Sequence, residues 1–495
     1  MRQRYAGERL GPLDSLFLYI ETKEMPLHIG SVFILDHSLP LDDLKSLIEA
    51  KLPLVPRYRQ RVVFPPLNAG YPTWEFDPEF SLDRHILHAR IRPGTEEALE
   101  ELAGGIFSRI MDRTHPLWDL TVVDGLRGGC SALIARVHHC LVDGVAGVAL
   151  LNLILDSGPA ASVRPRKRSF PPGPPPGPDA SLLDALLSSY SLAASRWFSM
   201  QSAALDAGQQ LLGELAQGSF LPPVEAVTGL IKPVAGLPFK VRCSGPRRVA
   251  WTEFPMAEID AIREPVGAKV NDVGVAILGI AMQRYAEAHR LEVKSRSLRL
   301  MMPVNLRSAE QRNGLGNQIS LVPMNVPLDC SSPLELLRAI HKRSDALKRA
   351  HAANLAVLGG SFLAMLPVPV QAGLTAVLSN NVPVLPFDMV CTNVPGPSEP
   401  LYVLGRKLLT YYPYVPIGDF MGICCAMVSY NGTFYFGLTG DSAAAPDLYR
   451  LRDFLDDAFL QLKRTTVKPA VRHRPRPKAK PAQLAALGPD LTAAK

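Results

Sequence analysis

The stretch His138-His139-Cys140-Leu141-Val142-Asp143-Gly144 joins two apolar runs of different kinds. Before it, residues 131–137 (SALIARV) have the length and composition of a mostly buried strand. Residues 144–155 (GVAGVALLNLIL) have those of a buried helix. The two histidines are therefore predicted to lie at the end of a strand, immediately before a helix, in a fold of the α/β class.

The paired histidines are suited to acid–base chemistry. Neighbouring residues of a strand point to opposite faces, so one imidazole can face a cleft while the other packs inside. An imidazole with a pKa near its ordinary value of about 6.5 accepts a proton from an alcohol at neutral pH. Asp143 can cap the following helix or pair with a basic residue, and Gly144 lets substrate or backbone approach closely. Each of these residues also has an ordinary structural interpretation, as a core histidine, a cap or a turn.

Cys140 offers a second mechanism, in which a thiolate activated by a neighbouring histidine is the nucleophile. Alternate strand residues share a face, so Cys140 is expected beside His138 and not beside His139, which favours a buried structural cysteine. A metal site made from His138, His139 and Asp143 is not favoured, because adjacent strand histidines do not readily bind one ion. We expect neither a metal nor a cofactor.

The formal charge of +7 is concentrated in one part of the chain. Residues 464–495 contain eight Lys or Arg and a single acidic residue, Asp490, so this Pro- and Ala-rich tail accounts for the whole excess. The rest of the chain is close to neutral, which argues against a nucleic-acid-binding fold. We interpret the tail as a disordered appendage that either stays solvated or contacts anionic lipid.

A length of 495 residues with 47% apolar side chains predicts two domains. We divide the chain into an α/β block with the histidines, a Pro-rich linker followed by bridging or interfacial helices, a second α/β block, and the tail; these are residues 1–156, 157–246, 247–463 and 464–495. Two blocks of similar size predict a cleft between them, which is where ligands usually bind.

Three elements of the second block can be predicted from its pattern. Residues 272–289 fit an amphipathic helix, and residues 298–304 and 390–397 fit strands, the last of which ends in a tight turn. The residues expected on the inner face of the helix are Val273, Ile277, Ile280 and Tyr285.

The location of the protein can be predicted in outline. The N-terminus has no continuous apolar run of the kind found in secretory signals, and seven cysteines without a C-x-x-C pair suit a reducing cytoplasm. Residues 352–387 carry no formal charge but contain several Pro and Gly, which favours two buried or interfacial helices over a membrane span. Residues 181–218 are also poor in charge and can form bridging or interfacial helices.

The histidine segment resembles the HHxxxDG motif of the CoA-dependent acyltransferase superfamily, which includes chloramphenicol acetyltransferase and peptide-synthetase condensation domains. Further segments are similar to those of the bacterial wax ester synthase/diacylglycerol acyltransferase family and follow its order over about residues 9–460. They are Leu13-Asp14, Pro26-Leu-His-Ile-Gly30, Leu54-Val-Pro-Arg-Tyr-Arg-Gln-Arg61, Pro116-Leu117-Trp118, Asn271-Asp272, Pro303-Val-Asn-Leu-Arg307, Gly316-Asn317 and Asn393-Val-Pro-Gly-Pro397. Departures such as Thr392 and Gly274 bear on substrate preference more than on chemistry.

The resemblance implies an α/β sandwich of two chloramphenicol-acetyltransferase-like subdomains with the active site at their interface. It implies that His139 is the general base, that His138 supports the loop, and that Asp143 orients it. The acceptor hydroxyl would attack the acyl-CoA thioester directly, without an acyl-enzyme. Asn271 and Asp272 lie at a predicted helix N-terminus, where they either face the oxyanion or cap the helix.

The resemblance also implies the substrates: a long-chain acyl-CoA, and either diacylglycerol or a long-chain alcohol as acceptor. Such substrates suggest a cytoplasmic protein that associates peripherally with the inner face of the membrane or with lipid droplets. Two other functions stay open. One is a catalytically silent lipid-droplet or membrane-binding protein with the same fold, and the other is a condensation-type acyltransferase that takes its acyl group from a carrier protein.

Overall fold

The computed structural model describes residues 7–68, 70–141, 154–159, 191, 236–305, 319–349, 387–418 and 420–466. Several predicted features fall outside these residues. They are Asp143 and Gly144, most of the helix predicted at 144–155, the linker beyond residue 159, nearly all of the apolar segments 181–218 and 352–387, Arg307, Gly316, Asn317 and the tail beyond residue 466.

Six strands form the first sheet, in the order β12-β13-β2-β7-β6-β5. Neighbouring strands are antiparallel, apart from the parallel pair β5 and β6. The strands are β2 (His28–Leu35), β5 (Ile86–Arg90), β6 (Trp118–Asp124), β7 (Ser131–His138), β12 (Tyr402–Val403) and β13 (Arg406–Tyr414). All eight residues of β7 are buried, which confirms the strand predicted before the histidines.

Six further strands form the second sheet, in the order β10-β9-β11-β14-β15-β8. They are β8 (Arg247–Pro255), β9 (Ser297–Asn305), β10 (Ile319–Pro327), β11 (Met389–Pro395), β14 (Ile423–Tyr430) and β15 (Thr433–Asp441). Strand β11 runs parallel to both of its neighbours, and the other pairs are antiparallel. The strands predicted at 298–304 and 390–397 are confirmed as β9 and β11.

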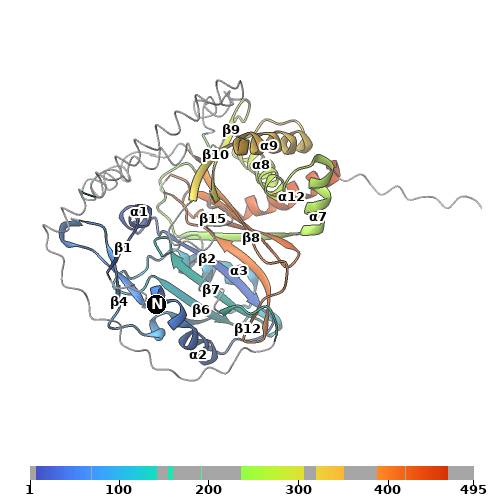
Figure 1. Cartoon of the computed structure of the whole chain (residues 1–495). Helices are drawn as coiled ribbons and strands as arrows, with labels where there is room; N and C mark the ends of the chain where they lie inside the picture. The colour runs from blue at the N-terminus through green and yellow to red at the C-terminus, as the bar shows by residue number, and fades with distance from the viewer. Residues whose placement is uncertain are drawn as a thin grey trace, which may run out of the picture.

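Four helices gather on one side of the second sheet (Figure 1): α7 (Met256–Arg263), α8 (Val270–Ala288), α9 (Pro333–Arg349) and α12 (Leu448–Thr466). The helix predicted at 272–289 is confirmed as α8, and the four residues expected on its inner face are buried. Thirteen residues of α8 are buried, so it is a central helix and not an amphipathic surface helix. The reason is that α9 and α12 pack against it from the sides that the sheet leaves open.

The first sheet is completed by a segment from far along the chain. Strand β13 pairs with β2, with Tyr414 opposite Gly30, and the short β12 extends the edge. Tyr412 of β13 stacks on Trp251 of β8 with ring centroids 4.7 Å apart, so the same strand also contacts the second sheet. Residues 402–414 therefore belong to the first sheet in space although they follow most of the second sheet in sequence. The division of the chain at residues 156 and 247 stays a prediction.

The remaining described elements surround the first sheet. They are α1 (Pro12–Ile20), α2 (Leu41–Lys51), α3 (Glu96–Phe107) and a three-stranded sheet of β1 (Glu8–Arg9), β4 (Thr73–Phe76) and β3 (Gln60–Val63). Helix α1 begins after Gly11 with Pro at its first position, where the missing N–H costs nothing, and the Ser15 hydroxyl donates to the Gly11 carbonyl at 2.8 Å. The mixed α/β class predicted from the sequence is confirmed.

Among the helices in the described ranges, none is by itself both long enough and apolar enough to cross a bilayer. The segment Met256–Val266 together with Val270–Ala288 meets those two conditions only as a pair, and the pair is bent by 97° at the break.

Helix α3 contacts both sheets. Its Phe107 ring stacks on Tyr414 of the first sheet, with centroids 3.7 Å apart. Toward the second sheet, the Glu100 carboxylate accepts a hydrogen bond from the Trp251 backbone N–H at 3.2 Å. Burial raises the pKa of Glu100 to about 8, even though the charge of Arg452 favours the ionised form. Gly104 lies so close to β8 that a Cβ atom there would meet the Arg247 carbonyl oxygen at 2.5 Å.

The close approach of α3 to β8 can be tested with two adjacent glycines. We expect Gly104→Ala to lower the free energy of unfolding by about 1–3 kcal/mol, because the new methyl group overpacks against a backbone carbonyl. Gly105→Ala is the matched control, since nothing lies within 4 Å of a Cβ at that exposed helical position. The control should raise the free energy of unfolding by about 0.5–1 kcal/mol. Urea denaturation measures both, and equal effects of the two substitutions would contradict the packing described.

Candidate active site

The two histidines lie where β7 ends. The backbone N–H of His138 donates to the Leu117 carbonyl, and that of His139 donates to the Leu27 carbonyl, each at 2.9 Å. The chain then turns, with the Leu141 N–H donating to the His138 carbonyl at 2.9 Å. The backbone of both histidines is therefore held from two sides, by the segment before β6 and by the segment before β2.

The His138 side chain is fully buried and has a polar neighbour near each ring nitrogen. Its Nδ1 accepts a hydrogen bond from the Cys140 N–H at 3.1 Å, and its Nε2 lies 3.3 Å from Oε1 of Glu21. Because Nδ1 is an acceptor, the proton of the neutral ring lies on Nε2 and faces the carboxylate. His138 thus lies beside the proposed base, and its role in supporting the loop stays a prediction.

Glu21 follows α1 directly, and its side chain is only 1% exposed. Besides contacting His138, it accepts hydrogen bonds from the Leu27 N–H at 2.8 Å and from Arg113 at 2.9 Å. Burial alone would raise the pKa of Glu21. The contacts with His138, Leu27 and Arg113 outweigh burial and lower the pKa to about 2, so the carboxylate is ionised at neutral pH.

The His139 side chain occupies a more open and more apolar position. It is partly exposed, and its ring stacks on Phe17 of α1 with centroids 4.0 Å apart and planes at 13°. Burial, with a smaller effect of the neighbouring His138, lowers the pKa of His139 to about 4, although its own backbone carbonyl opposes this shift. At pH 7 the imidazole is therefore neutral and able to accept a proton.

Cys140 is 3% exposed. Burial raises the pKa of its thiol well above the usual range, and the nearby carboxylates of Asp14 and Glu21 add to the effect. A thiol that stays protonated is a poor nucleophile, which weighs against the thiolate mechanism. All seven cysteines are free, and no cluster of His, Cys, Asp or Glu suited to a metal ion occurs in the part of the chain that the structure describes.

Asn271 and Asp272 lie in the first turn of α8. The buried Asp272 carboxylate accepts hydrogen bonds from the Lys269 N–H at 3.0 Å and from His341 of α9 at 2.9 Å, so it caps the helix and ties it to α9. The Asn271 side chain accepts a hydrogen bond from Asn393 of β11 at 3.3 Å. Over the described ranges, no hydrogen bond, ion pair or ring contact joins either residue to the histidines. Their role at the oxyanion stays a prediction, and so do the roles of Asp143 and Gly144.

The Pro116-Leu117-Trp118 segment packs in the core. Trp118 is buried, its indole N–H donates to the Tyr58 carbonyl at 2.8 Å, and its ring stacks on His85 with centroids 4.5 Å apart. Leu117 supplies the carbonyl that holds the His138 backbone. The segment therefore acts on the site through the backbone.

Three residues of this site were not predicted from the sequence: Phe17, Glu21 and Arg113. A phenylalanine in an apolar helix and a glutamate in a charged turn carry no signal of their own in a single sequence. The one signal that could have indicated them is their position in the sequence, since both Phe17 and Glu21 lie close to the Leu13-Asp14 segment that resembles the family.

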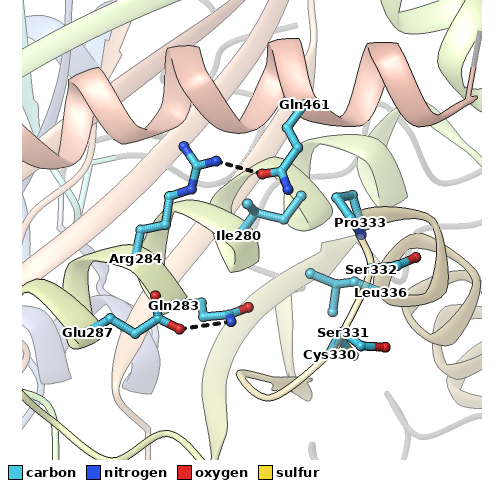
Figure 2. Close-up of a pocket in the computed structure, with 10 residues that line it drawn as sticks. All are labelled: Ile280, Gln283, Arg284, Glu287, Cys330, Ser331, Ser332, Pro333, Leu336 and Gln461. Atoms are coloured by element: carbon cyan, nitrogen blue, oxygen red, sulfur yellow. Dashed lines mark hydrogen bonds between the residues drawn. The ribbon is translucent and has the colours of Figure 1, made fainter.

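A cavity of about 210 Å³ lies elsewhere, between α8, α12 and the segment before α9 (Figure 2). Arg284 spans it to Gln461 with a hydrogen bond of 2.6 Å, and Gln283 bonds to Glu287 along α8. Its volume is below the range of about 300–1,000 Å³ that is usual for small-molecule sites. Its lining contains none of the predicted site residues, so we do not assign the substrates to it.

Two family models match the chain. The model described as "Wax ester synthase/diacylglycerol acyltransferase catalytic domain" matches residues 10–274, and "WS/DGAT C-terminal domain" matches residues 315–463. The chain belongs to the wax ester synthase/diacylglycerol acyltransferase family. The resemblance noted in the sequence is thereby confirmed.

The relatives with similar sequences agree with this family. The chain is 30% identical over 467 residues to a probable diacylglycerol O-acyltransferase, tgs1, of Mycobacterium tuberculosis, a match that covers 92% of this chain and 95% of the relative. A second such protein of that organism, tgs2, is 29% identical, with 91% and 98% covered.

The fold is similar to that of the wax ester synthase/diacylglycerol acyltransferase from Marinobacter aquaeolei VT8, with a TM-score of 0.64, 24% identity, and 93% of this chain and all of that chain covered. The first condensation domain of the CDA synthetase has the same fold, with a TM-score of 0.56, 13% identity, and 94% and 98% covered. The predicted architecture of two chloramphenicol-acetyltransferase-like subdomains is confirmed.

The low pKa of His139 predicts how stability depends on pH. Between pH 6.5 and about 4 the unfolded chain binds a proton on this residue that the folded chain does not. The stability that the neutral ring supplies is complete above pH 6.5 and decreases as the pH falls through this window.

We therefore expect the His139 signal of histidine-labelled protein to titrate near pH 4 by NMR. A His139→Gln variant, which lacks the titrating group, should lose less stability than the wild type between pH 7 and pH 5. A His139 titration near pH 6.5 would show that the ring is not desolvated as described.

Proposed function

We propose that this protein transfers a long-chain fatty acyl group from acyl-CoA to a lipid hydroxyl, with His139 as the general base. The observation that carries the proposal is the similarity to probable diacylglycerol O-acyltransferases over more than nine-tenths of the chain. The names of those relatives favour diacylglycerol as the acceptor, which makes the product a triacylglycerol. A long-chain alcohol, which gives a wax ester, is the second acceptor that the family name suggests.

In the proposed reaction, the neutral imidazole of His139 accepts the proton of the acceptor hydroxyl. The hydroxyl oxygen attacks the thioester carbon, and the bond to sulfur breaks as the tetrahedral intermediate collapses. The proton held on His139 then passes to the departing CoA thiolate, which restores the neutral base. General-base help of this kind accelerates a reaction by roughly 10²- to 10⁴-fold.

The apolar contact with Phe17 supports this assignment. A ring stacked on a phenylalanine is poorly solvated, and poor solvation keeps the imidazole unprotonated over the physiological pH range. We assign Asp143 and Gly144 to orientation of the loop, and the first turn of α8 at Asn271 and Asp272 to the oxyanion, as the family resemblance implies.

Association with a lipid surface is part of the proposal. Both product classes are insoluble in water, and residues 181–218 and 352–387 are poor in charge. We propose peripheral binding to a membrane or lipid-droplet surface, with these segments in contact with lipid.

The proposal predicts acceptor-dependent release of CoA. With palmitoyl-CoA and a diacylglycerol, the wild type should release CoA and form triacylglycerol, and His139→Ala should lower kcat by at least about 10²-fold. Hexadecanol in place of the diacylglycerol measures wax ester synthesis.

Binding of the wild type and of His139→Ala to lipid vesicles is the control. If the wild type binds lipid but forms neither product, the catalytically silent lipid-binding function is correct instead. Activity with acyl carrier protein but not with acyl-CoA would identify a condensation-type acyltransferase.

A further inference from the structure

Glu21 is connected to His139 by three routes, each of which is a series of contacts between residues. The first runs through Leu27, whose N–H donates to Glu21 at 2.8 Å and whose carbonyl accepts the His139 N–H at 2.9 Å. A single residue, Leu27, therefore links the carboxylate to the backbone of the proposed base. If the carboxylate were removed, the Leu27 N–H would lose its partner, and the backbone on the N-terminal side of the Leu27 carbonyl would be less firmly held.

The second route runs through His138. Glu21 faces the protonated Nε2 at 3.3 Å, which leaves Nδ1 to accept the Cys140 N–H at 3.1 Å. The backbone immediately after His139 is thus fixed by the orientation of one imidazole ring. That ring keeps its orientation and tautomer because the carboxylate favours the proton on Nε2.

The third route runs through Arg113 and α1. Arg113 donates to Glu21 at 2.9 Å and to the Leu18 carbonyl, in the last turn of α1, at 2.8 Å. The helix also carries Phe17, on which the His139 ring stacks. The ion pair between Arg113 and Glu21 therefore fixes the helix that sets the orientation of the His139 ring.

We propose that Glu21 is the positioning residue of this active site: it holds His139 in place through Leu27, His138 and α1, without touching the substrate. The proposal rests on the function proposed for His139. Position matters for rate, because a displacement of about 1 Å of a catalytic group can cost on the order of 10²-fold. The buried carboxylate thus has a specific role in catalysis beyond its contribution to folding.

Two variants of Glu21 distinguish the effect of its charge from the effect of its side-chain volume. Glu21→Ala removes every contact, and we expect kcat to fall on the order of 10- to 100-fold while the KM for acyl-CoA changes by less than about 2-fold. Glu21→Gln keeps the shape and one oxygen acceptor but loses the charge that pairs with Arg113. It should restore only part of the lost kcat, whereas a purely space-filling role predicts full restoration, because glutamine has the same shape and volume as glutamate.

Glu24→Gln is the matched control. Glu24 lies in the same turn, its side chain is exposed, and the carbonyl that it offers to Arg247 belongs to the backbone and survives the substitution. We expect kcat and KM of this variant to equal those of the wild type.

A measurement independent of activity is the titration of His139, followed by NMR in histidine-labelled protein. Loss of positioning exposes the ring to water, so its pKa should rise toward the ordinary value of about 6.5 in Glu21→Ala, less so in Glu21→Gln, and not in Glu24→Gln. If the wild type proves inactive, the proposed function fails, and this titration alone decides the positioning role. Unchanged kcat and unchanged titration in folded Glu21→Gln and Glu21→Ala would overturn the proposal, as would a rise in KM at constant kcat.

Discussion

The architecture depends on one long-range strand pairing. Strand β13 comes late in the chain but lies beside β2 in the first sheet, where Tyr414 is opposite Gly30. From the same strand, Tyr412 stacks on Trp251 and donates a hydrogen bond to Glu253, both in β8 of the second sheet. Strand β13 therefore links the two sheets, and Trp251 of the second sheet shares one hydrophobic core with Tyr412 and Tyr414.

The same region explains where the site forms. β2 and β7 pair over their whole length, with His28 opposite His138, so the histidine segment begins where β7 ends and β2 starts. His28 is fully buried beside the stacked rings of Phe107 and Tyr414, whose centroids lie 6.0 and 5.6 Å from its own. Burial, with the positive charge of Arg136, lowers the pKa of His28 well below its usual value, so His28 itself adds no charge beside the proposed base. The low pKa of His139 itself comes mainly from burial of its own ring.

Whether an element could be predicted from the sequence depends on how far apart in the chain its interacting residues lie. β7, α8, β9 and β11 could be predicted because local apolar patterns specify them. The position of β13 could not, because its pairing with β2 spans more than 370 residues and no local pattern names the partner. Likewise His138 and His139 were recognised from their motif, whereas Glu21 and Phe17 reach the site only because α1 docks against the end of β7.

The central claim is direct acyl transfer promoted by neutral His139, and the kinetic order of the two substrates tests it most directly. Initial rates measured against acyl-CoA at several acceptor concentrations should give intersecting double-reciprocal lines, because both substrates must be bound before the hydroxyl attacks. Parallel lines, together with an acylated protein detected by mass spectrometry in the absence of acceptor, would indicate a covalent intermediate and contradict the account.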